Sequence, residues 1–414
     1  MARKSRGLPA RPPSARSAEE VAVNGHGLSD EEIERSLLTG ENSGVLEDLF
    51  GTAQYQELRR LTQVAERRSV RGGDRVLILP GIMGSRLGAP RRFLPPDIIW
   101  FDPVDVARGR LDELALPGSG RIEAVGVFLF AYLGLKLKLR IAGYDADFAP
   151  YDWRKSLKTL GRELADRIKQ EDKRVHLVAH SMGGLVARAS FAHAPDIARL
   201  VMLGTPNFGS FAPVLAMRGV HGLIRRVAQL DVRHSLDQLA TVFGAFPGLL
   251  EMIPAAGAAG ASDLFDLANW PTAGTLPSAR NLKAAKTVQD SLPTSCSGTE
   301  IIMIAGVNQE TVVDARRGEG GGEFVYTLSN EGDGTVPLRC ALLPSAEQTY
   351  YVEGKHGFLP GNSQIQRALP SILATGRTAE LPDTPPASRG ATERTVPEEA
   401  LEPPIALETR GRLP

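Results

Sequence analysis

Continuous apolar runs alternate with amphipathic stretches through the middle of the chain. The runs DRVLILPGIMGSRLG (74–88), RVHLVAH (174–180) and ARLVMLGTP (198–206) lead into glycine or proline turns, which is typical of parallel strands buried on both faces. Between them, leucines and isoleucines at helical spacing predict a helix at about 155–172, and SMGGLVARASFAHA (181–194) predicts another. This alternation predicts an α/β fold with a mostly parallel central sheet and helices on both faces.

Further elements flank this centre. SDEE, with Ser29 three residues before Glu32, is an N-terminal helix signal, and Tyr55, Leu58 and Leu61 follow at helical spacing. The pattern also predicts a core helix at 125–143, a last helix at about 362–375, and strands, which are DADFAPYDWR (145–154), TEIIMIAGVN (299–308), EFVYTLS (323–329) and QTYYVEG (348–354).

These patterns divide the chain into four parts. Residues 1–27 are rich in Arg, Pro, Ser and Gly and are expected to be disordered. Residues 28–73 are expected to be helical, and 74–376 to form the main domain. Residues 207–297 interrupt the alternation of strands and helices. Their sequence is rich in Ala, Gly, Pro and Leu, which predicts an inserted helical cap. The Pro- and Glu-rich tail 377–414 is expected to be disordered.

Composition narrows the partners and the compartment. The charges of the 48 basic and 48 acidic residues cancel. No net electrostatic field therefore favours binding to nucleic acid or to an anionic membrane. Cys296 and Cys340 are too few for a disulfide scaffold or a cysteine zinc site. The first twenty residues lack an apolar signal region, and the apolar run 125–144 is broken by Lys136, Lys138 and Arg140. A cytoplasmic protein without a transmembrane segment is expected.

The strongest chemical signal is the turn AHSMGG, where a buried strand meets a helix at Ser181. A serine presented on so tight a turn requires small residues two positions away on either side, and Ala179 and Gly183 satisfy this requirement. The alternative is a small-residue helix start capped by Ser181. That alternative does not account for the preceding strand, so Ser181 is the expected nucleophile.

A serine hydroxyl needs a base, and the base needs an orienting acid. Elimination among the seven histidines leaves His356, in the glycine-bearing loop after the strand at 348–354. Asp333, between two glycines in EGDGTVP, is the favoured acid, with Glu331 and Asp314 as rivals. The order Ser, Asp, His along the chain is typical of α/β-hydrolases.

An acyl-transfer site also needs two backbone N–H groups to stabilise the oxyanion. One comes from the residue after the nucleophile, and the other from the loop after the first strand. These rules assign the amides of Met182 and Ile82. The glycines of PGIMGS let the main chain approach a substrate oxygen. The loop lacks the Gly-Lys-Ser/Thr ending of a phosphate-binding loop.

Taken together, LPGIMGS, APYDWR, AHSMGG, LGTPNFGS, GDGTVP and GKHGF resemble the motifs of the lecithin:cholesterol acyltransferase family of α/β-hydrolases, over about residues 74–375. The resemblance implies an α/β-hydrolase fold, Ser181, Asp333 and His356 as the catalytic triad, Ile82 and Met182 as the oxyanion hole, and a cap over an acyl pocket. It also implies that Trp153 borders this pocket, with a role as a core anchor as the alternative.

The expected function is therefore hydrolysis or acyl transfer on carboxylic esters, with lipid or fatty-acyl substrates indicated by the apolar cap. No metal or cofactor is required. The alternative is a non-catalytic binding or scaffold protein that keeps the fold. The acyl donor and acceptor and the oligomeric state stay open.

Overall fold

The structure is a computed structural model that describes residues 28–68, 73–92, 96–100, 106–118, 121–258, 262–387 and 393–401. The expected tail at 1–27 lies outside the described residues.

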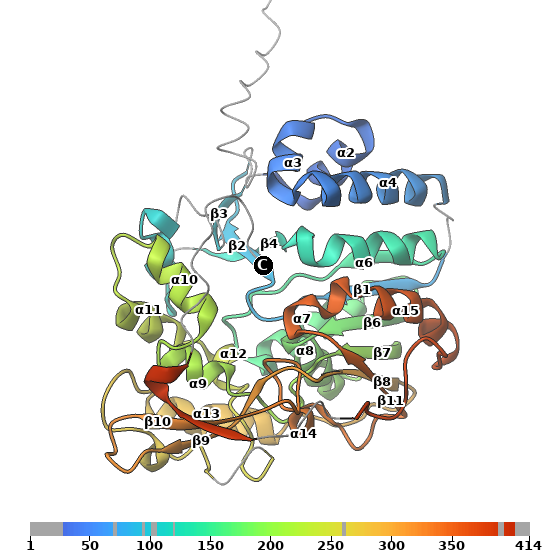
Figure 1. Ribbon diagram of the computed structural model, residues 1–414. Helices are drawn as coiled ribbons and strands as arrows, with labels where there is room; N and C mark the ends of the chain where they lie inside the picture. The colour runs from blue at the N-terminus through green and yellow to red at the C-terminus, as the bar shows by residue number, and fades with distance from the viewer. Residues whose placement is uncertain are drawn as a thin grey trace, which may run out of the picture.

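Six parallel strands form the central sheet, in the order β11-β8-β7-β6-β1-β5 (Figure 1). Alternate side chains serve opposite faces: Leu77 and Leu79 pack in one core, whereas Val76 and Ile78 pack in the other. Burial on both faces explains why these strands read as continuous apolar runs, and the predicted parallel sheet is confirmed. The strands are β1 (Arg75–Leu79), β5 (Asp145–Phe148), β6 (Val175–His180), β7 (Ile197–Leu203), β8 (Glu300–Val307) and β11 (Gln348–Glu353).

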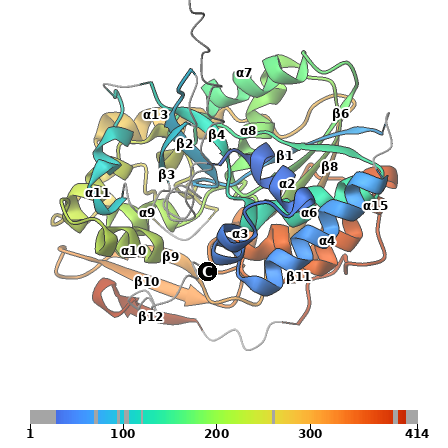
Figure 2. The same ribbon diagram turned by 90° about the horizontal axis from the view of Figure 1, so that it is seen from above.

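Helices cover both faces of this sheet (Figure 2). On one face lie α7 (Leu157–Ile168) and α8 (Met182–Ser190), whose apolar side chains pack with Leu77 and Leu79. On the other lie α6 (Leu129–Ile141) and α15 (Ser363–Thr375), which share a core with Val76 and Ile78. The central unit is thus a three-layer α/β arrangement.

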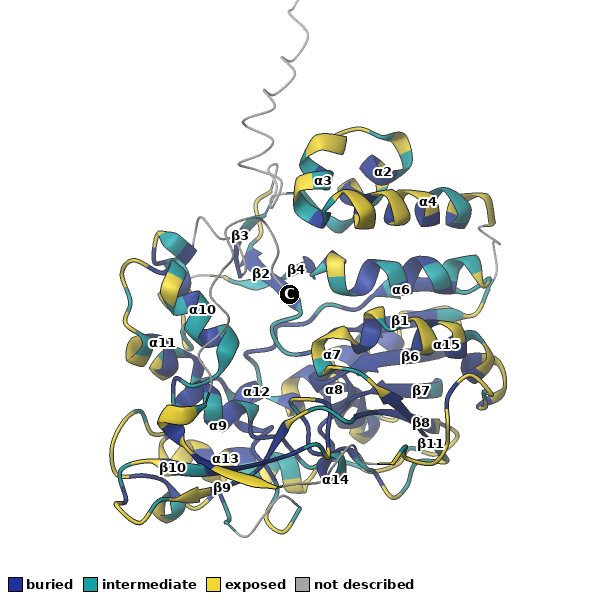
Figure 3. Ribbon diagram, viewed as in Figure 1, coloured by how far each residue is buried: buried dark blue, intermediate teal, exposed yellow. Residues whose placement is uncertain are grey.

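Three N-terminal helices form a further layer on α6. They are α2 (Asp30–Thr39), α3 (Ser43–Phe50) and α4 (Thr52–Arg68). The predicted capping box is present, because Ser29 Oγ accepts from the Glu32 amide and Glu32 accepts from the Ser29 amide. The helix α4 buries one side against α6 and exposes the other (Figure 3).

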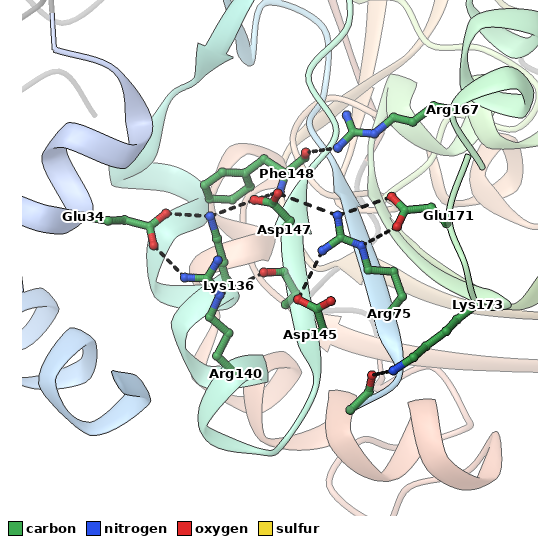
Figure 4. A network of polar contacts seen from close by, with 12 residues as sticks. Glu34, Arg75, Lys136, Arg140, Asp145, Asp147, Phe148, Arg167, Glu171 and Lys173 are labelled. Carbon is green, nitrogen blue, oxygen red and sulfur yellow. Dashed lines mark hydrogen bonds and ion pairs between the residues drawn. The ribbon is translucent and has the colours of Figure 1, made fainter. Parts of the chain in front are cut away.

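An ion-pair network joins these helices to the sheet (Figure 4). Glu34 of α2 accepts from Lys136 Nζ at 2.6 Å and from Arg140 at 2.7 Å, and Lys136 also pairs with Asp147 of β5 at 2.9 Å. Lys136, which interrupts the apolar run in the sequence, is therefore buried and paired. Among the described helices, none has the length and apolarity needed to cross a bilayer.

The predicted cap region contains α9 (Ala212–Met217), α10 (Gly222–Leu230), α11 (Leu236–Phe243), α12 (Pro247–Leu250), η4 (Leu267–Asn269) and α13 (Ala279–Asp290). It contacts the loop that follows β5, where the Gly248 amide donates to the Arg154 carbonyl. The cap is thereby fixed at the carboxyl edge of the sheet, where the functional loops emerge.

A second, antiparallel sheet supports the cap, contains the strand predicted at 323–329 and corrects one expectation about the tail. The segment predicted as a strand at 323–329 is β10 (Phe324–Ser329), which lies outside the central sheet between β9 (Thr311–Arg317) and β12 (Arg394–Pro397). The predicted disorder of the tail 377–414 does not hold at 394–400, where β12 and the 3₁₀ turn η6 (Glu398–Ala400) return to this sheet. Residues 388–392 and 402–414 of this tail lie outside the described residues. Glu398 pairs with the buried Arg218 at 2.8 Å, which links η6 to the cap.

A third small sheet precedes α6. It consists of β2 (Ser85–Ala89), β3 (Asp97–Trp100) and β4 (Glu123–Val127), with β2 in the middle, and η2 (Arg110–Leu114) lies between the last two. The predicted helix at 125–143 is therefore too long at its start. Its first residues pair with β2 as a strand, and the helix begins at Leu129.

Candidate active site

Ser181 lies on a sharp turn between β6 and α8. Its φ of 54° and ψ of −124° are strained for a residue other than glycine. The Ser181 amide donates to the Leu203 carbonyl at 2.9 Å, and the Gly184 amide donates to the Ser181 carbonyl at 3.0 Å, which fixes the turn. A strained serine between a strand and a helix is the nucleophile-elbow geometry that the sequence predicts.

Two glycines allow this turn to pack closely. A Cβ at Gly183 would lie 2.7 Å from the Pro80 carbonyl oxygen, in agreement with the small residue predicted there. A Cβ at Gly184 would lie 2.0 Å from Thr205 Oγ1. The rule of small residues two positions either side of the serine does not predict this need for glycine at 184. Both positions require glycine because neighbouring loops approach the start of α8.

The structure brings Ser181, His356 and Asp333 together. Ser181 Oγ lies 2.8 Å from His356 Nε2, and His356 Nδ1 lies 2.7 Å from Asp333 Oδ2. Ser181 is 4 % exposed and Asp333 is buried. Three side chains from separate segments thus form one hydrogen-bonded array in a largely water-excluded place, where electrostatic interactions are strong.

The loop geometry explains why Asp333 occupies the acid position. Asp333 Oδ1 accepts from the amides of Thr335 and Val336 at 3.0 and 2.7 Å, which leaves Oδ2 for the histidine. The His356 amide also donates to the Asp333 carbonyl at 2.8 Å. The rivals lie elsewhere: Glu331 is exposed, and Asp314 pairs with Arg316 on β9.

Two further glycines provide space for the array, and sequence analysis did not single them out. A Cβ at Gly306 would lie 2.5 Å from Asp333 Cβ, and one at Gly204 would lie 3.0 Å from Asp333 Oδ2. Gly204 also has a φ of 58°. The position of Gly204, directly after a buried strand in LGTP, is the only sequence signal for this role.

The loop after β1 borders Ser181 closely. A Cβ at Gly81 would lie 3.0 Å from Ser181 Cβ, so glycine allows this approach. The Gly84 amide donates to the Gly81 carbonyl at 3.0 Å and closes a turn over Ile82. Neither the Ile82 amide nor the Met182 amide donates a hydrogen bond to another residue in the described part of the chain. Both predicted oxyanion donors therefore belong to segments that flank Ser181.

Trp153 does not line a pocket in this structure. Its side chain is 0 % exposed, stacks parallel to Phe243 and makes edge contacts with Trp100 and Phe246. Its Nε1 donates to the Ser85 carbonyl at 3.2 Å, just beyond the loop after β1. The burial of the indole and its packing against three aromatic rings favour the alternative of a core anchor over a pocket wall.

Two other aromatic side chains lie beside the array, and sequence analysis did not select them. Tyr132 contacts Gly81 and His180, and His180 contacts the main chain of His356. Burial, with a smaller effect of the neighbouring His356, lowers the pKa of His180 to about 3. Among the described residues, no group of three or more His, Cys, Asp or Glu side chains could hold a metal ion.

Solved structures of other proteins are similar to this chain. Among solved structures, a chain of the Tle4–Tli4 complex matches with a TM-score of 0.56 and 14% identity, over 73% of this chain and 98% of that one. The mature lipase BlEst2 of Bacillus licheniformis matches with a TM-score of 0.39 and 17% identity, over 74% and 92%. No curated protein matches the sequence.

A family model gives the assignment. The model of the alpha/beta hydrolase family matches residues 76–304, which is more than half of the chain. This segment contains the central strands from β1 to most of β8 and the turn at Ser181. The predicted fold class is confirmed, and the protein belongs to the alpha/beta hydrolase family.

Proposed function

We propose that this protein is a serine hydrolase or acyltransferase that acts on carboxylic esters through an acyl-enzyme on Ser181. One observation carries the proposal: Ser181 Oγ, His356 and Asp333 are joined by hydrogen bonds of 2.8 and 2.7 Å in a hydrolase fold. Nucleophile, base and orienting acid within hydrogen-bond reach are the requirements of nucleophilic acyl transfer.

In the first step Ser181 Oγ attacks the ester carbonyl carbon while its proton moves to His356 Nε2. The C=O electron pair moves to the oxygen and generates a tetrahedral oxyanion. When this intermediate collapses, the bond to the leaving alcohol breaks and His356 Nε2 protonates that oxygen. The acyl group then remains on Ser181, and the neutral alcohol departs.

The second half repeats these transfers with a new nucleophile. His356 Nε2 takes a proton from water or a second alcohol, whose oxygen attacks the acyl-enzyme, and the proton finally returns to Ser181 Oγ. Water gives hydrolysis, whereas an alcohol gives acyl transfer. Both reactions use the same side chains and differ only in the acceptor.

Asp333 keeps the base in the required tautomer. Because two backbone amides already donate to Oδ1, Oδ2 faces His356 Nδ1 and accepts a hydrogen bond from the Nδ1–H group. This leaves Nε2 unprotonated and directed at Ser181 before attack. The carboxylate also stabilises the positively charged ring that forms during each proton transfer.

The oxyanion is assigned to the amides of Ile82 and Met182. Two observations support the assignment: both flank Ser181, and neither donates to another described residue. Such donors act where charge develops in the transition state, and the loss of one costs about 10²- to 10³-fold in kcat.

We further propose lipid or fatty-acyl esters as substrates, within the lecithin:cholesterol acyltransferase group that the sequence motifs resemble. Phe358, two residues after His356, is 55 % exposed, and Phe130 at the start of α6 is also exposed. The 3₁₀ turn η5 (His356–Gly361), which contains Phe358, contacts α6. An exposed aromatic side chain two residues from the base suits an apolar acyl chain.

The proposal is tested by hydrolysis of esters with acyl groups from acetyl to palmitoyl, with and without an acceptor alcohol. We expect Ser181→Ala and His356→Ala to lower kcat by about 10⁴- to 10⁶-fold. Ser190→Ala is the matched control, because this buried serine in α8 donates only to the Ala187 carbonyl.

A second comparison tests the acid. Asp333→Asn should lower kcat by about 10⁴-fold, as expected when the histidine tautomer is lost. Asp314→Asn and Glu331→Gln should leave activity intact. Equal activity in Ser181→Ala and wild type would contradict the proposal, and so would a larger loss in Asp314→Asn than in Asp333→Asn.

A further inference from the structure

Tyr132 and His180 form a polar bridge between the two loops that border Ser181. The Tyr132 hydroxyl lies 2.9 Å from the Gly81 amide and 2.8 Å from His180 Nδ1. His180 Nε2 lies 3.0 Å from the His356 carbonyl oxygen. Tyr132 is 3 % exposed and His180 is 6 % exposed, so the bridge is nearly closed to water.

Chemistry permits only one arrangement of protons along this bridge. The His356 carbonyl oxygen can only accept, so His180 Nε2 must carry a hydrogen. With its pKa lowered to about 3 by burial, the His180 ring is neutral at ordinary pH and has a single N–H. Its Nδ1 therefore accepts from the Tyr132 hydroxyl, whose oxygen accepts from the Gly81 amide.

Each end of the bridge holds a main-chain group that lies next to a group that the proposed reaction uses. At one end, the Tyr132 hydroxyl binds the Gly81 amide, and the Gly84 amide binds the Gly81 carbonyl. The first bond holds the Pro80–Gly81 peptide unit, and the second holds the next peptide unit, which carries the Ile82 N–H. The orientation of this oxyanion donor therefore depends on Tyr132.

At the other end, the main chain of His356 is held on both sides. Its amide donates to the Asp333 carbonyl at 2.8 Å, and its carbonyl accepts from His180 Nε2 at 3.0 Å. The rings of His180 and His356 also lie with their centroids 5.0 Å apart. His180 thus limits how far the base can move from Ser181.

We propose that Tyr132 and His180 are positioning residues that hold the oxyanion loop and the His356 loop at a fixed separation. The inference rests on the proposed acyl-transfer function. Attack requires the oxyanion donor and the base to act on one tetrahedral centre at the same time. A bridge between their backbones keeps that spacing without touching the substrate.

The test is the Tyr132→Phe variant, which removes one hydroxyl and keeps the ring. Active sites are first counted by exhaustive titration with a fluorophosphonate, so that misfolded protein does not enter the rate. We expect kcat per titrated site to fall by about 10- to 100-fold, with KM changed by less than about threefold, because alignment is lost in the transition state. A role in stability alone would lower the number of sites and leave kcat per site unchanged.

Tyr326→Phe is the matched control. Tyr326 is also a buried tyrosine with one hydrogen-bonded hydroxyl, which donates to Glu398 in the sheet that supports the cap. Its loss should leave kcat per site within about twofold of wild type.

A double-mutant cycle tests whether the two residues act as one bridge. His180→Asn retains an acceptor toward Tyr132 but does not reach the His356 carbonyl. Because both single changes interrupt the same chain, the double variant should have a kcat within about threefold of the slower single variant. Losses that multiply would overturn the proposal.

Ring ¹⁵N chemical shifts of His180, assigned by their loss in His180→Asn, test the bridge in the wild-type protein. They should report an Nε2–H tautomer at neutral pH, and an Nδ1–H tautomer would overturn the proposal. So would a Tyr132→Phe kcat per site equal to that of Tyr326→Phe. A wild-type protein that neither cleaves esters nor reacts with the probe would instead refute the proposed function, before any variant is compared.

Discussion

Glu251 connects the cap to the central domain and makes stability depend on pH. It follows α12, is buried, and its carboxylate accepts from the Leu157 amide at the start of α7 at 2.6 Å. Burial raises the pKa of Glu251 to about 7, against the lowering effects of hydrogen bonds from Ser156 and Leu157. The folded protein therefore binds a proton at this carboxyl more tightly than the unfolded chain does.

This difference sets both the sign and the size of the effect. The stabilisation is fully present below the ordinary carboxyl pKa of 4.5 and is lost as the pH rises through about 7. The shift from 4.5 to about 7, at about 1.4 kcal/mol per pKa unit, corresponds to about 3 kcal/mol. Glu251→Gln keeps an oxygen for the Leu157 amide but does not ionise. The variant should therefore gain stability relative to wild type as the pH rises.

Urea unfolding of both proteins between about pH 4 and pH 8.5 measures this gain. The free energy of unfolding of Glu251→Gln, minus that of wild type, should increase by about 3 kcal/mol across this range. In thermal unfolding, the difference in Tm between Glu251→Gln and wild type should increase by about 3 to 4 °C across the same pH range, for a chain of this length. Glu66→Gln, at an exposed position on α4, is the control and should show no such trend. A difference that is constant with pH would refute the reasoning.

Three other changes test the packing around the site, the packing of α6 and the returning tail. Gly184→Ala places a Cβ 2.0 Å from Thr205 Oγ1, so we expect a loss of about 1–3 kcal/mol in unfolding free energy together with reduced esterase activity. Gly134→Ala in α6, with no neighbour closer than 3.8 Å, should instead stabilise by about 0.5–1 kcal/mol. Glu398→Ala leaves the buried Arg218 without its carboxylate and should cost about 3 kcal/mol in a urea melt; a cost below about 0.5 kcal/mol would show that η6 does not hold the cap.

The parts of the molecule that were predictable from the sequence are those with local signals. The three apolar runs predicted β1, β6 and β7 because burial on both faces leaves few polar positions in a strand. Ser181 was identifiable because a strand, a serine and small residues lie within one short segment. His356 and Asp333 needed only their glycine-bearing loops and their order along the chain.

The features that escaped sequence analysis depend on distant contacts. Tyr132 reads as an ordinary member of an apolar helix, and its role depends on how α6 packs beside Gly81 and His180. His180 reads as one more residue of a buried strand. No periodicity in either segment indicates that a single hydrogen-bonded bridge joins them.

The tail shows the same limit for the fold. The segment 394–397 is short and follows a Pro-rich stretch of sequence, so composition indicates disorder there. They are ordered by pairing with β10, and Glu398 is ordered by Arg218 of the cap. Trp153 likewise reads as a possible pocket residue, and the aromatic cluster that encloses it comes largely from the cap.

The most direct test of the central claim is covalent labelling of Ser181. Purified protein is treated with a fluorophosphonate, and the modified peptide is identified by mass spectrometry in wild type, Ser181→Ala and the control Ser190→Ala. The account predicts one adduct on Ser181 in wild type and in Ser190→Ala, and none in Ser181→Ala. An unlabelled wild-type protein, or an adduct that persists in Ser181→Ala, would contradict it.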